Sequence, residues 1–535
     1  MYEMTKLDWG VMALFFVVMI GIGLFTSVLI KNTKDYFTGG GKMPWWLLGV
    51  SHHVSGYSAV AFTAYAKIAY TTGFTVYIWW AVPISLACFV GIFFIVSRWS
   101  RLRTRYNIES PLEYLSTRYD VPTQQILAWW GVLLKILDVG AKWVAVALVI
   151  TTFAPNISFT NAVFLSVGLG LFYSTIGGLW AGTLTDFAMF IVQFVSGISM
   201  LVVVLARLGG LSAIWTMWDQ PALEGHLAPM AGEYGTWSCI IGLFLINLLG
   251  YNGGTWNLAQ RFIAAPQGSD ARKAALLSAA LYLVWPLVLF FPMWACPLLL
   301  PGLPEDQLEK SYCLMVVKFL PPGLTGLMLA ALVSHTLTMT TADATAITSV
   351  LVRDVFPKIS PSVKFTRPKQ QLLIARVVTL VFMLLTTVVA LENEHFGSII
   401  GIVIVWFGAL LGPVSIAMIL GLMPWFRHCG VGATLSSLAA GIGVFAVMKF
   451  LPHVTPETFQ GFPSWFPAAK AVELSQCLST KGMTIIIPTV VSFVVYAGVG
   501  LVSAIRGQKV PERVDRLLEA ISTDEPLSPE YTEEQ

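Results

Sequence analysis

Two stretches of the sequence combine glycine with small polar residues inside long apolar segments. One is Ser51–Ser58, which contains two adjacent histidines, and the other is Gly250–Asn257. A helix that unwinds inside a membrane exposes backbone groups, which is tolerated only where they line a cavity or a ligand. Bare carbonyl groups can coordinate a cation there, and the N-termini of half-helices favour anions. The alternative interpretation is a pair of packing kinks at helix crossings.

A second group of ionisable residues lies in another apolar segment. Lys135, Asp138 and Lys142 are spaced by three and four residues, so a helix would place them on one face. An unpaired charge is costly to bury, and we therefore expect Asp138 to pair with at least one lysine. Two lysines and one aspartate would leave one positive charge for an anionic ligand. The alternative is a structural ion pair, with the second lysine extending to the membrane surface.

The chain that positions these residues has the composition of a membrane protein. Of its 535 residues, 56% are apolar and 11% are charged, and the mean hydropathy is +0.74. Soluble domains are about a quarter charged. The apolar blocks are about 20 residues long, which is enough to cross the hydrocarbon layer of a membrane. The stretch after Asp8 is too long for a cleaved signal peptide and lacks a basic leader, so we interpret it as the first membrane helix.

We predict an all-α membrane protein with about thirteen transmembrane helices. Lysine and arginine gather in alternate loops, and the positive-inside rule places those loops in the cytoplasm. The N-terminus is then outside and the C-terminus inside, with residues 506–535 forming a cytoplasmic tail. A short helix is expected at 513–520. The predicted spans are 9–30, 44–70, 74–97, 123–153, 159–179, 181–207, 236–259, 272–301, 322–350, 371–391, 397–424, 430–451 and 482–504.

The two interrupted segments lie in the second and seventh predicted helices. A separation of five helices is what two inverted five-helix repeats would give, each repeat opening on a broken helix. We therefore divide a transmembrane domain of residues 1–505 into a first helix, a repeat over 44–207, a repeat over 236–424 and the last helices over 430–504.

Several separate motifs make residues 9–505 similar to the sodium/solute symporter family. The most specific is Tyr173–Leu179 followed by Thr185, Asp186 and Gln193. The resemblance implies a LeuT-like fold of two inverted repeats that transports by alternating access in the cell's inner (plasma) membrane, and it implies no enzymatic activity. The other motifs are Asp35-Tyr36-Phe37, Pro44-Trp45-Trp46, Pro111–Leu115, Arg118-Tyr119, Gln260-Arg261, Ala330–Ser334 and Gly412-Pro413.

The resemblance also implies a sodium site between the second and ninth helices. The ligands carried over by position would be the carbonyl groups of Ser51, Val54 and Ala331 and the hydroxyl of Ser334. These are hard oxygen ligands of the type that such cations need. The family has a second hydroxyl where this chain has His335, and an imidazole is a poor ligand for sodium.

Two hypotheses for the coupling ion follow from this departure. His335, together with His53, could carry protons, because histidine titrates near neutral pH and ionisable groups at membrane depth are usually functional. Sodium coupling is the other hypothesis, with a neutral His335 that is hydrogen-bonded to a helix carbonyl and fills space. Asp186 and Thr338 match family residues near the cation exit path, where some members hold a second sodium ion; Leu337 replaces a further hydroxyl of that site.

The resemblance places the solute pocket beside the broken helices. Aromatic faces there can stack on sugar rings, although tryptophans also form belts at membrane surfaces. Trp80 stands where galactose-type members have a carboxylate, so we do not extend galactose or glucose to this chain. In relatives that carry acidic sugars, a cationic residue near Lys135 and Lys142 meets the substrate. The residues expected at the pocket are Ser55, Ser58, Trp79, Trp80, Lys135, Asp138, Trp256 and Asn257.

We therefore predict a symporter that imports a small polar organic solute, such as a sugar or sugar acid, along a sodium gradient. A proton-coupled symporter and a solute sensor without transport are the alternatives. The expected partners are the solute, a cation and the lipid bilayer, with no nucleic acid and no organic cofactor, and we expect a monomer. Cys313 and Cys477 fall in loops predicted outside, where they are either bridged or free.

Overall fold

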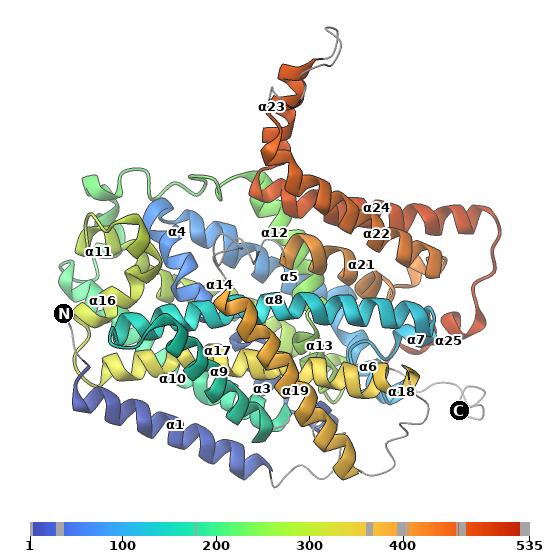
Figure 1. Cartoon of the computed structure of the whole chain (residues 1–535), viewed down its shortest axis with the longest axis horizontal. Helices are drawn as coiled ribbons and strands as arrows, with labels where there is room; N and C mark the ends of the chain where they lie inside the picture. Colours follow the sequence, from blue (N-terminus) through green and yellow to red (C-terminus); the bar gives the residue numbers. More distant parts are fainter. Residues whose placement is uncertain are drawn as a thin grey trace.

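The computed structural model describes residues 4–27, 37–176, 179–359, 368–392, 403, 406–455, 458 and 467–524. Within these ranges every regular element is a helix. Figure 1 shows most of the long helices running side by side, with the N-terminus at one end of the assembly and the C-terminal helix at the other. The prediction of an all-helical protein is confirmed for the described residues.

Nine helical segments of the described chain are apolar and long enough to cross a membrane. Of the other four predicted spans, 44–70 is broken, 123–153 carries the charged cluster, and 159–179 and 397–424 extend beyond the described residues. The total of thirteen spans therefore stays a prediction. The nine segments are Lys6–Thr26, Tyr77–Phe94, Gly182–Arg207, Trp237–Gly254, Gly268–Leu299, Leu324–Ile359, Leu373–Leu391, Val431–His453 and Lys481–Ile505.

The helices follow the predicted order along the chain. Helix α1 (Lys6–Ser27) comes first. The range of the first repeat contains α3 (Trp45–Val54), α4 (Ala64–Thr72), α5 (Val82–Phe94), α6 (Val96–Tyr106), α7 (Leu115–Arg118), α8 (Val121–Phe153), α9 (Phe159–Ile176) and α10 (Leu179–Arg207). The range of the second contains α12 (Trp237–Leu249), α13 (Trp256–Ile263), α14 (Gly268–Trp294), α15 (Cys296–Leu299), α16 (Ser311–Phe319), α17 (Leu324–Ser349), α18 (Phe356–Ile359), α19 (Pro368–Leu391) and α21 (Gly412–Leu420).

Outside the ranges predicted for the two repeats, the elements are fewer. Between the repeats lies the short helix α11 (Ala213–Thr216), and the chain continues after the second repeat with α22 (Val431–Phe450), α23 (Ala468–Leu478), α24 (Lys481–Ile505) and α25 (Glu512–Ala520). Helix α25 confirms the short helix expected in the tail. The cysteines are all free, Cys313 buried and Cys477 exposed, so the suggested disulfide is not formed.

Both predicted breaks are present. Helix α3 ends at Val54, the chain is extended at Ser58, and α4 begins only at Ala64. In the second repeat α12 ends at Leu249, and a wide turn, η6 (Gly250–Gly254), leads into α13. Gly253 has φ +128°, and a Cβ atom there would lie 2.3 Å from Trp99 Nε1. Only glycine combines this backbone angle with such a close approach.

Helix α17 is the most deeply buried of the nine apolar segments. Of its most apolar stretch 83% is buried, against 22–56% for the other eight. It packs against α8, α9 and α10, and it crosses the middle of the assembly in Figure 1. The first turn of α17 is held by α1, because the buried Asp8 carboxylate accepts hydrogen bonds from the backbone N–H groups of Gly323 (2.7 Å) and Gly326 (2.9 Å). A carboxylate at a helix N-terminus also stabilises the helix dipole.

The C-terminal helix α25 is fastened to the transmembrane domain by Arg101 of α6. The guanidinium donates to both oxygens of Asp524, at 2.8 and 3.1 Å, and to the carbonyl groups of Ile521 and Ser522, at 3.0 and 2.7 Å. These hydrogen bonds lower the pKa of Asp524 below its ordinary value of 3.8. The ion pair therefore stabilises the docked tail above pH 3.8, and this contribution is lost as the pH falls through the lowered pKa.

We predict that Arg101→Ala releases the tail at neutral pH, because α25 then loses the contacts of the guanidinium. Amide hydrogen exchange over residues 512–524 should become at least several times faster, while exchange in α17 stays unchanged. Lys273→Ala, which removes a cation that is 56% exposed, is the control. Equal exchange in the Arg101 variant and the control would show that other contacts hold the tail.

Candidate solute and cation site

A cavity of about 70 Å³ lies between the two broken helices. The first break contributes Ser55 and Ser58 to its wall, and the second contributes Tyr251 and Thr255. The cavity thus lies where transporters built from inverted repeats bind their substrates. Other polar or aromatic side chains in the wall are Tyr65, Trp80, Asp138, Lys142, Asn247 and Phe407.

The structure brings some of the predicted solute residues together and separates others. Ser55, Ser58, Trp80 and Asp138 line the central cavity. Two further predicted residues, Lys135 and Trp256, line a neighbouring cavity of about 20 Å³, and Trp79 lines another of about 20 Å³. The side chain of Asn257 is buried and lines none of the three.

Three of the polar or aromatic lining residues, Tyr65, Asn247 and Phe407, were missed by sequence reasoning. The Tyr65 ring lies 5.3 Å from the Trp80 ring, which itself lies 5.1 Å from Tyr57. Asn247 is buried, and its Nδ2 group has no hydrogen-bond partner among the described residues. An amide within the apolar run that leads into the second break was the signal for Asn247. Tyr65 gave no comparable signal, because aromatic residues are common throughout this chain.

The charged residues of α8 form a four-membered cluster with Asp343 of α17. Lys135 lies 2.5 Å from Asp138 and 3.0 Å from Asp343, and Lys142 lies 2.8 Å from Asp138 and 2.7 Å from Asp343. All four side chains are buried, with exposures of 0–7%. The prediction that Asp138 pairs with lysine is confirmed. The predicted spare positive charge is wrong, because Asp343 balances it from a distant part of the chain.

We predict that Asp343→Asn destabilises the folded protein by about 3 kcal/mol, because it leaves two buried lysines sharing one carboxylate. The measurement is thermal unfolding in detergent. The double variant Asp343→Asn with Lys142→Met removes the second charge as well and should recover a large part of the loss. A double variant less stable than Asp343→Asn alone would show that the pairing energy is not the cause.

The other buried ion pair joins Asp186 of α10 to Arg261 of α13. Arg261 Nη2 lies 3.2 Å from Asp186 Oδ2, and both side chains are 1% exposed. The Ser51 hydroxyl donates to the same carboxylate oxygen at 2.5 Å. Arg261 also donates to the hydroxyl groups of Ser51 (3.2 Å) and Ser55 (3.0 Å). The guanidinium thus connects the predicted cation site to a residue of the central cavity.

The predicted span 236–259 leaves Arg261 in the loop that follows it, on the side taken as cytoplasmic, and this placement in a loop is wrong. It lies within α13, and its Nη1 group donates to the Asn257 carbonyl one turn earlier, at 2.9 Å. Its position directly after an apolar, glycine-interrupted segment was the available signal. The predicted span simply ended too early, at residue 259, so the arginine fell outside it.

Of the predicted cation ligands, Ser51 contacts this ion pair directly. Val54 and Ala330, the neighbour of Ala331, belong to one buried cluster of side chains between α1, α3, α10 and α17. The Ser334 hydroxyl is buried and has no hydrogen-bond partner among the described residues, and the same holds for Asp186 Oδ1. Thr338 donates to the His335 carbonyl at 3.1 Å. Two unpartnered oxygens in a buried region are the kind of donor set that a small cation requires.

The three histidines have different surroundings. His52 is held on both sides of its ring, by the Ser278 hydroxyl at 2.7 Å and the Tyr251 carbonyl at 2.9 Å. His53 and His335 are fully buried, and none of their ring nitrogens has a partner among the described residues. A hydrogen bond from the His335 ring to a helix carbonyl is therefore not seen. His52 has a structural role, while His53 and His335 remain candidates for binding an ion.

A helical membrane protein with two spans that break around a buried polar cavity is a secondary transporter by architecture. The model of the sodium:solute symporter family matches residues 36–441. The chain belongs to this family, and it is therefore a sodium-coupled symporter embedded in a membrane.

Individual relatives agree with this assignment. The chain is 24% identical over 446 residues to the sodium/sialic acid symporter NanT of Aliivibrio fischeri, covering 79% of this chain and 84% of the relative. It is 27% identical over 498 residues to the human sodium/iodide cotransporter, covering 88% and 73%. Among solved structures, a Na⁺-coupled sialic acid symporter in a substrate-bound outward-open state superposes with a TM-score of 0.74 at 19% identity, covering 93% of this chain and 98% of that one.

Proposed function

We propose that this chain imports a small polar organic solute by alternating access, driven by a sodium gradient. The observation that carries the proposal is the cavity between the two breaks, where Ser55 and Ser58 meet Tyr251 and Thr255. Unwound backbone on both sides of a polar cavity inside the membrane has no purely structural advantage. Each peptide group that leaves a helix must find another hydrogen-bond partner.

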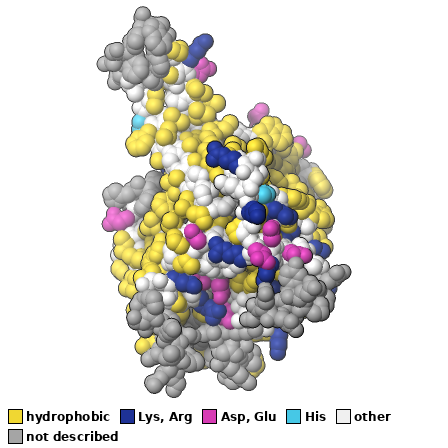
Figure 2. All heavy atoms as spheres, turned by 90° about the vertical axis from the view of Figure 1, so that its right-hand side faces the viewer, with side chains coloured by type: hydrophobic (Ala, Val, Ile, Leu, Met, Phe, Trp, Pro, Cys, Tyr) yellow, Lys and Arg dark blue, Asp and Glu magenta, His cyan; other side chains and the backbone are white. Residues whose placement is uncertain are grey.

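The orientation in the membrane follows from the charge distribution. Lys and Arg side chains gather on the end of the molecule that carries α25, as Figure 2 shows. The positive-inside rule assigns this end to the cytoplasm. The proposed orientation therefore has α1 beginning outside and α25 inside, in the inner (plasma) membrane of the cell, with the chain acting as a monomer.

The lining of the central cavity favours a small hydroxyl-bearing solute. The hydroxyl groups of Ser55 and Ser58 and the Asn247 amide can donate to or accept from sugar hydroxyls, and Trp80 offers an aromatic face. Lys142 is the lysine of the charged cluster that lines this cavity. We propose a sugar acid, or a similar small organic acid, as the substrate class, because two relatives are named as sodium/sialic acid symporters. The carboxylate of such a solute would compete with Asp138 and Asp343 for Lys142, since the cluster itself is neutral.

We predict that Lys142→Gln weakens binding of an acidic sugar at least tenfold while a neutral sugar of equal size changes less than twofold, because only the acid loses a charge partner. The solute is first identified by thermal shift against sugars, sugar acids and carboxylates. Lys135→Gln is the matched control, since it disturbs the same buried cluster but lines a different cavity. Similar affinities of the two variants for both kinds of solute would refute an acidic substrate held by Lys142.

Sodium is the proposed driving ion, held between α3, α10 and α17. The proposed ligands are the carbonyl groups of Ser51, Val54 and Ala331 and the Ser334 hydroxyl, beside the Asp186 carboxylate. Sodium bound there would share Asp186 with the guanidinium of Arg261. Arg261 also donates a hydrogen bond to the Ser55 hydroxyl. Any shift of the guanidinium therefore changes the position of a side chain in the wall of the solute cavity. This chain of contacts is a physical route by which the ion affects the solute.

Proton coupling is the second candidate, and it is favoured by the two buried histidines without hydrogen-bond partners among the described residues, His53 and His335. In this alternative the protonated imidazole replaces sodium at the crossing of α3 and α17. The family membership of the chain favours sodium.

Uptake into liposomes under separate sodium and proton gradients distinguishes the two ions. We predict sodium-driven uptake, with Ser334→Ala raising the sodium concentration for half-maximal uptake about tenfold because one oxygen ligand is lost. His335→Asn should leave uptake dependent on sodium. Uptake that follows only the proton gradient, and that His335→Asn abolishes, would overturn sodium coupling. Equal uptake without either gradient would exclude both ions.

A further inference from the structure

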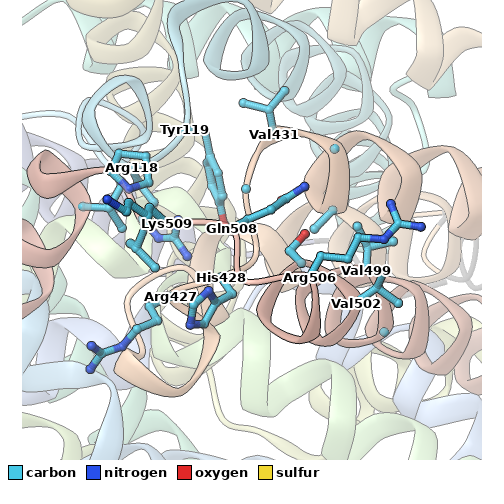
Figure 3. A pocket seen from close by; sticks show the side chains of 18 of the residues that line it. Arg118, Tyr119, Arg427, His428, Val431, Val499, Val502, Arg506, Gln508 and Lys509 are labelled. Atoms are coloured by element: carbon cyan, nitrogen blue, oxygen red, sulfur yellow. The ribbon is translucent and has the colours of Figure 1, made fainter.

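A second and much larger cavity lies far from the broken helices. Its volume is about 790 Å³, compared with about 70 Å³ for the central cavity. It is enclosed by the start of α22, the last turns of α24, the linker that leads to α25, and residues at the end of α7. Figure 3 shows the side chains of these segments arranged around the cavity.

The charge of this cavity is strongly one-sided. Its basic side chains come from three separate parts of the chain, and its lining contains no Asp or Glu among the described residues. Arg506 and Lys509 are exposed and form no ion pair with any described residue. Among the described residues, one acidic side chain pairs with a basic residue of the lining: Asp515 lies 3.6 Å from Arg427. The basic residues are Arg118, Arg427, His428, Arg506, Lys509 and Arg513.

The basic residues differ in their freedom to bind a ligand. Arg118 is committed to the fold, because it donates to the carbonyl groups of Gly421 (2.8 Å) and Phe426 (2.7 Å). Arg506 and Lys509 lie in the linker and line the cavity from opposite sides in Figure 3, Arg506 beside Val499 and Lys509 beside Arg118. His428 has a buried Nδ1 atom without a partner in the described part of the chain. The cavity therefore presents two exposed cations and one unused polar nitrogen, in addition to a fixed arginine.

One wall of the same cavity is apolar and continues along a helix that faces lipid. Val495, Val499 and Val502 follow one face of α24 at spacings of four and three residues. Val502 is 46% exposed, and its neighbours Leu501 and Ile505 are 62% and 77% exposed. The apolar helix ends at Ile505, and the polar linker begins at Arg506. This boundary is where the hydrocarbon layer of a membrane gives way to phospholipid head groups.

We propose that this cavity binds an anionic phospholipid, with its head group lying between Arg506 and Lys509 and an acyl chain lying along Val495, Val499 and Val502. The cations alone would suit any phosphate, but the adjoining lipid-facing apolar wall matches a head group joined to a hydrocarbon chain. Basic pockets between helices on the cytoplasmic side of a membrane are suited to this class of lipid. The site is separate from the solute cavity and does not depend on the proposed substrate.

The test uses delipidated full-length protein in detergent and measures the shift in Tm during titration with dioctanoyl phosphatidylglycerol. Dioctanoyl phosphatidylcholine and inorganic phosphate are the parallel probes. We expect stabilisation by phosphatidylglycerol that greatly exceeds the effect of either probe. The variant Arg506→Gln with Lys509→Gln should require at least tenfold more lipid for the same shift. The control Lys273→Gln with Lys358→Gln removes two exposed cations outside the cavity and should stay within twofold of the unmodified protein.

Three results would overturn the proposal. Equal stabilisation by inorganic phosphate would assign the cavity to a soluble anion, and equal stabilisation by phosphatidylcholine would show that the head-group charge is not recognised. Equal weakening of lipid binding in the two double variants would show that the stabilisation comes from general surface charge. A photoreactive phosphatidylglycerol gives a readout on the unmodified protein: labelling within residues 495–513 supports the site, and labelling only elsewhere contradicts it.

Discussion

The fold depends on one constraint, which is that every peptide group inside the membrane needs a hydrogen-bond partner within the protein. At the two breaks, side chains from other helices supply these partners. The Tyr282 hydroxyl donates to the carbonyl groups of His52 (3.1 Å) and His53 (2.8 Å) at the end of α3. Trp99 donates to the Asn252 carbonyl (2.8 Å), and Thr336 accepts from the backbone of Ala59 (2.8 Å). The breaks are therefore stable irregularities, and they leave a polar space between them.

The same constraint applies to the buried charges beside the central cavity, which occur as balanced groups. The lysines of α8 are neutralised by one aspartate on their own helix and one on α17, and Asp186 is neutralised by Arg261. A broken ion pair inside a protein is far more costly than an exposed one. Both groups adjoin the central cavity, Lys142 directly and Arg261 through Ser55. An arriving ion or solute therefore changes an electrostatic balance that spans several helices, which is a physical basis for coupling.

Particular residues show which parts of the site sequence reasoning could reach. The breaks were located correctly because glycine and polar residues interrupt an otherwise continuous apolar run, and this pattern is local. The pairing of Asp138 with lysine was also local, since residues three and four positions apart are neighbours on a helix. The ion-pair partners of Asp343 and Arg261 were not identified, because they are roughly 200 and 75 positions away and a single sequence gives no measure of such contacts.

The sequence by itself determined that this chain is a helical membrane protein with two interrupted spans, because hydrophobic length and residue spacing follow from local chemistry. The family motifs added the expectation of a symporter, which the match over residues 36–441 confirms. Only the tertiary structure decided that the charged cluster is neutral, that four of the expected solute residues share one cavity, and that the tail closes a basic pocket beside α24. These features depend on the packing of distant helices, and packing is a property of the whole chain.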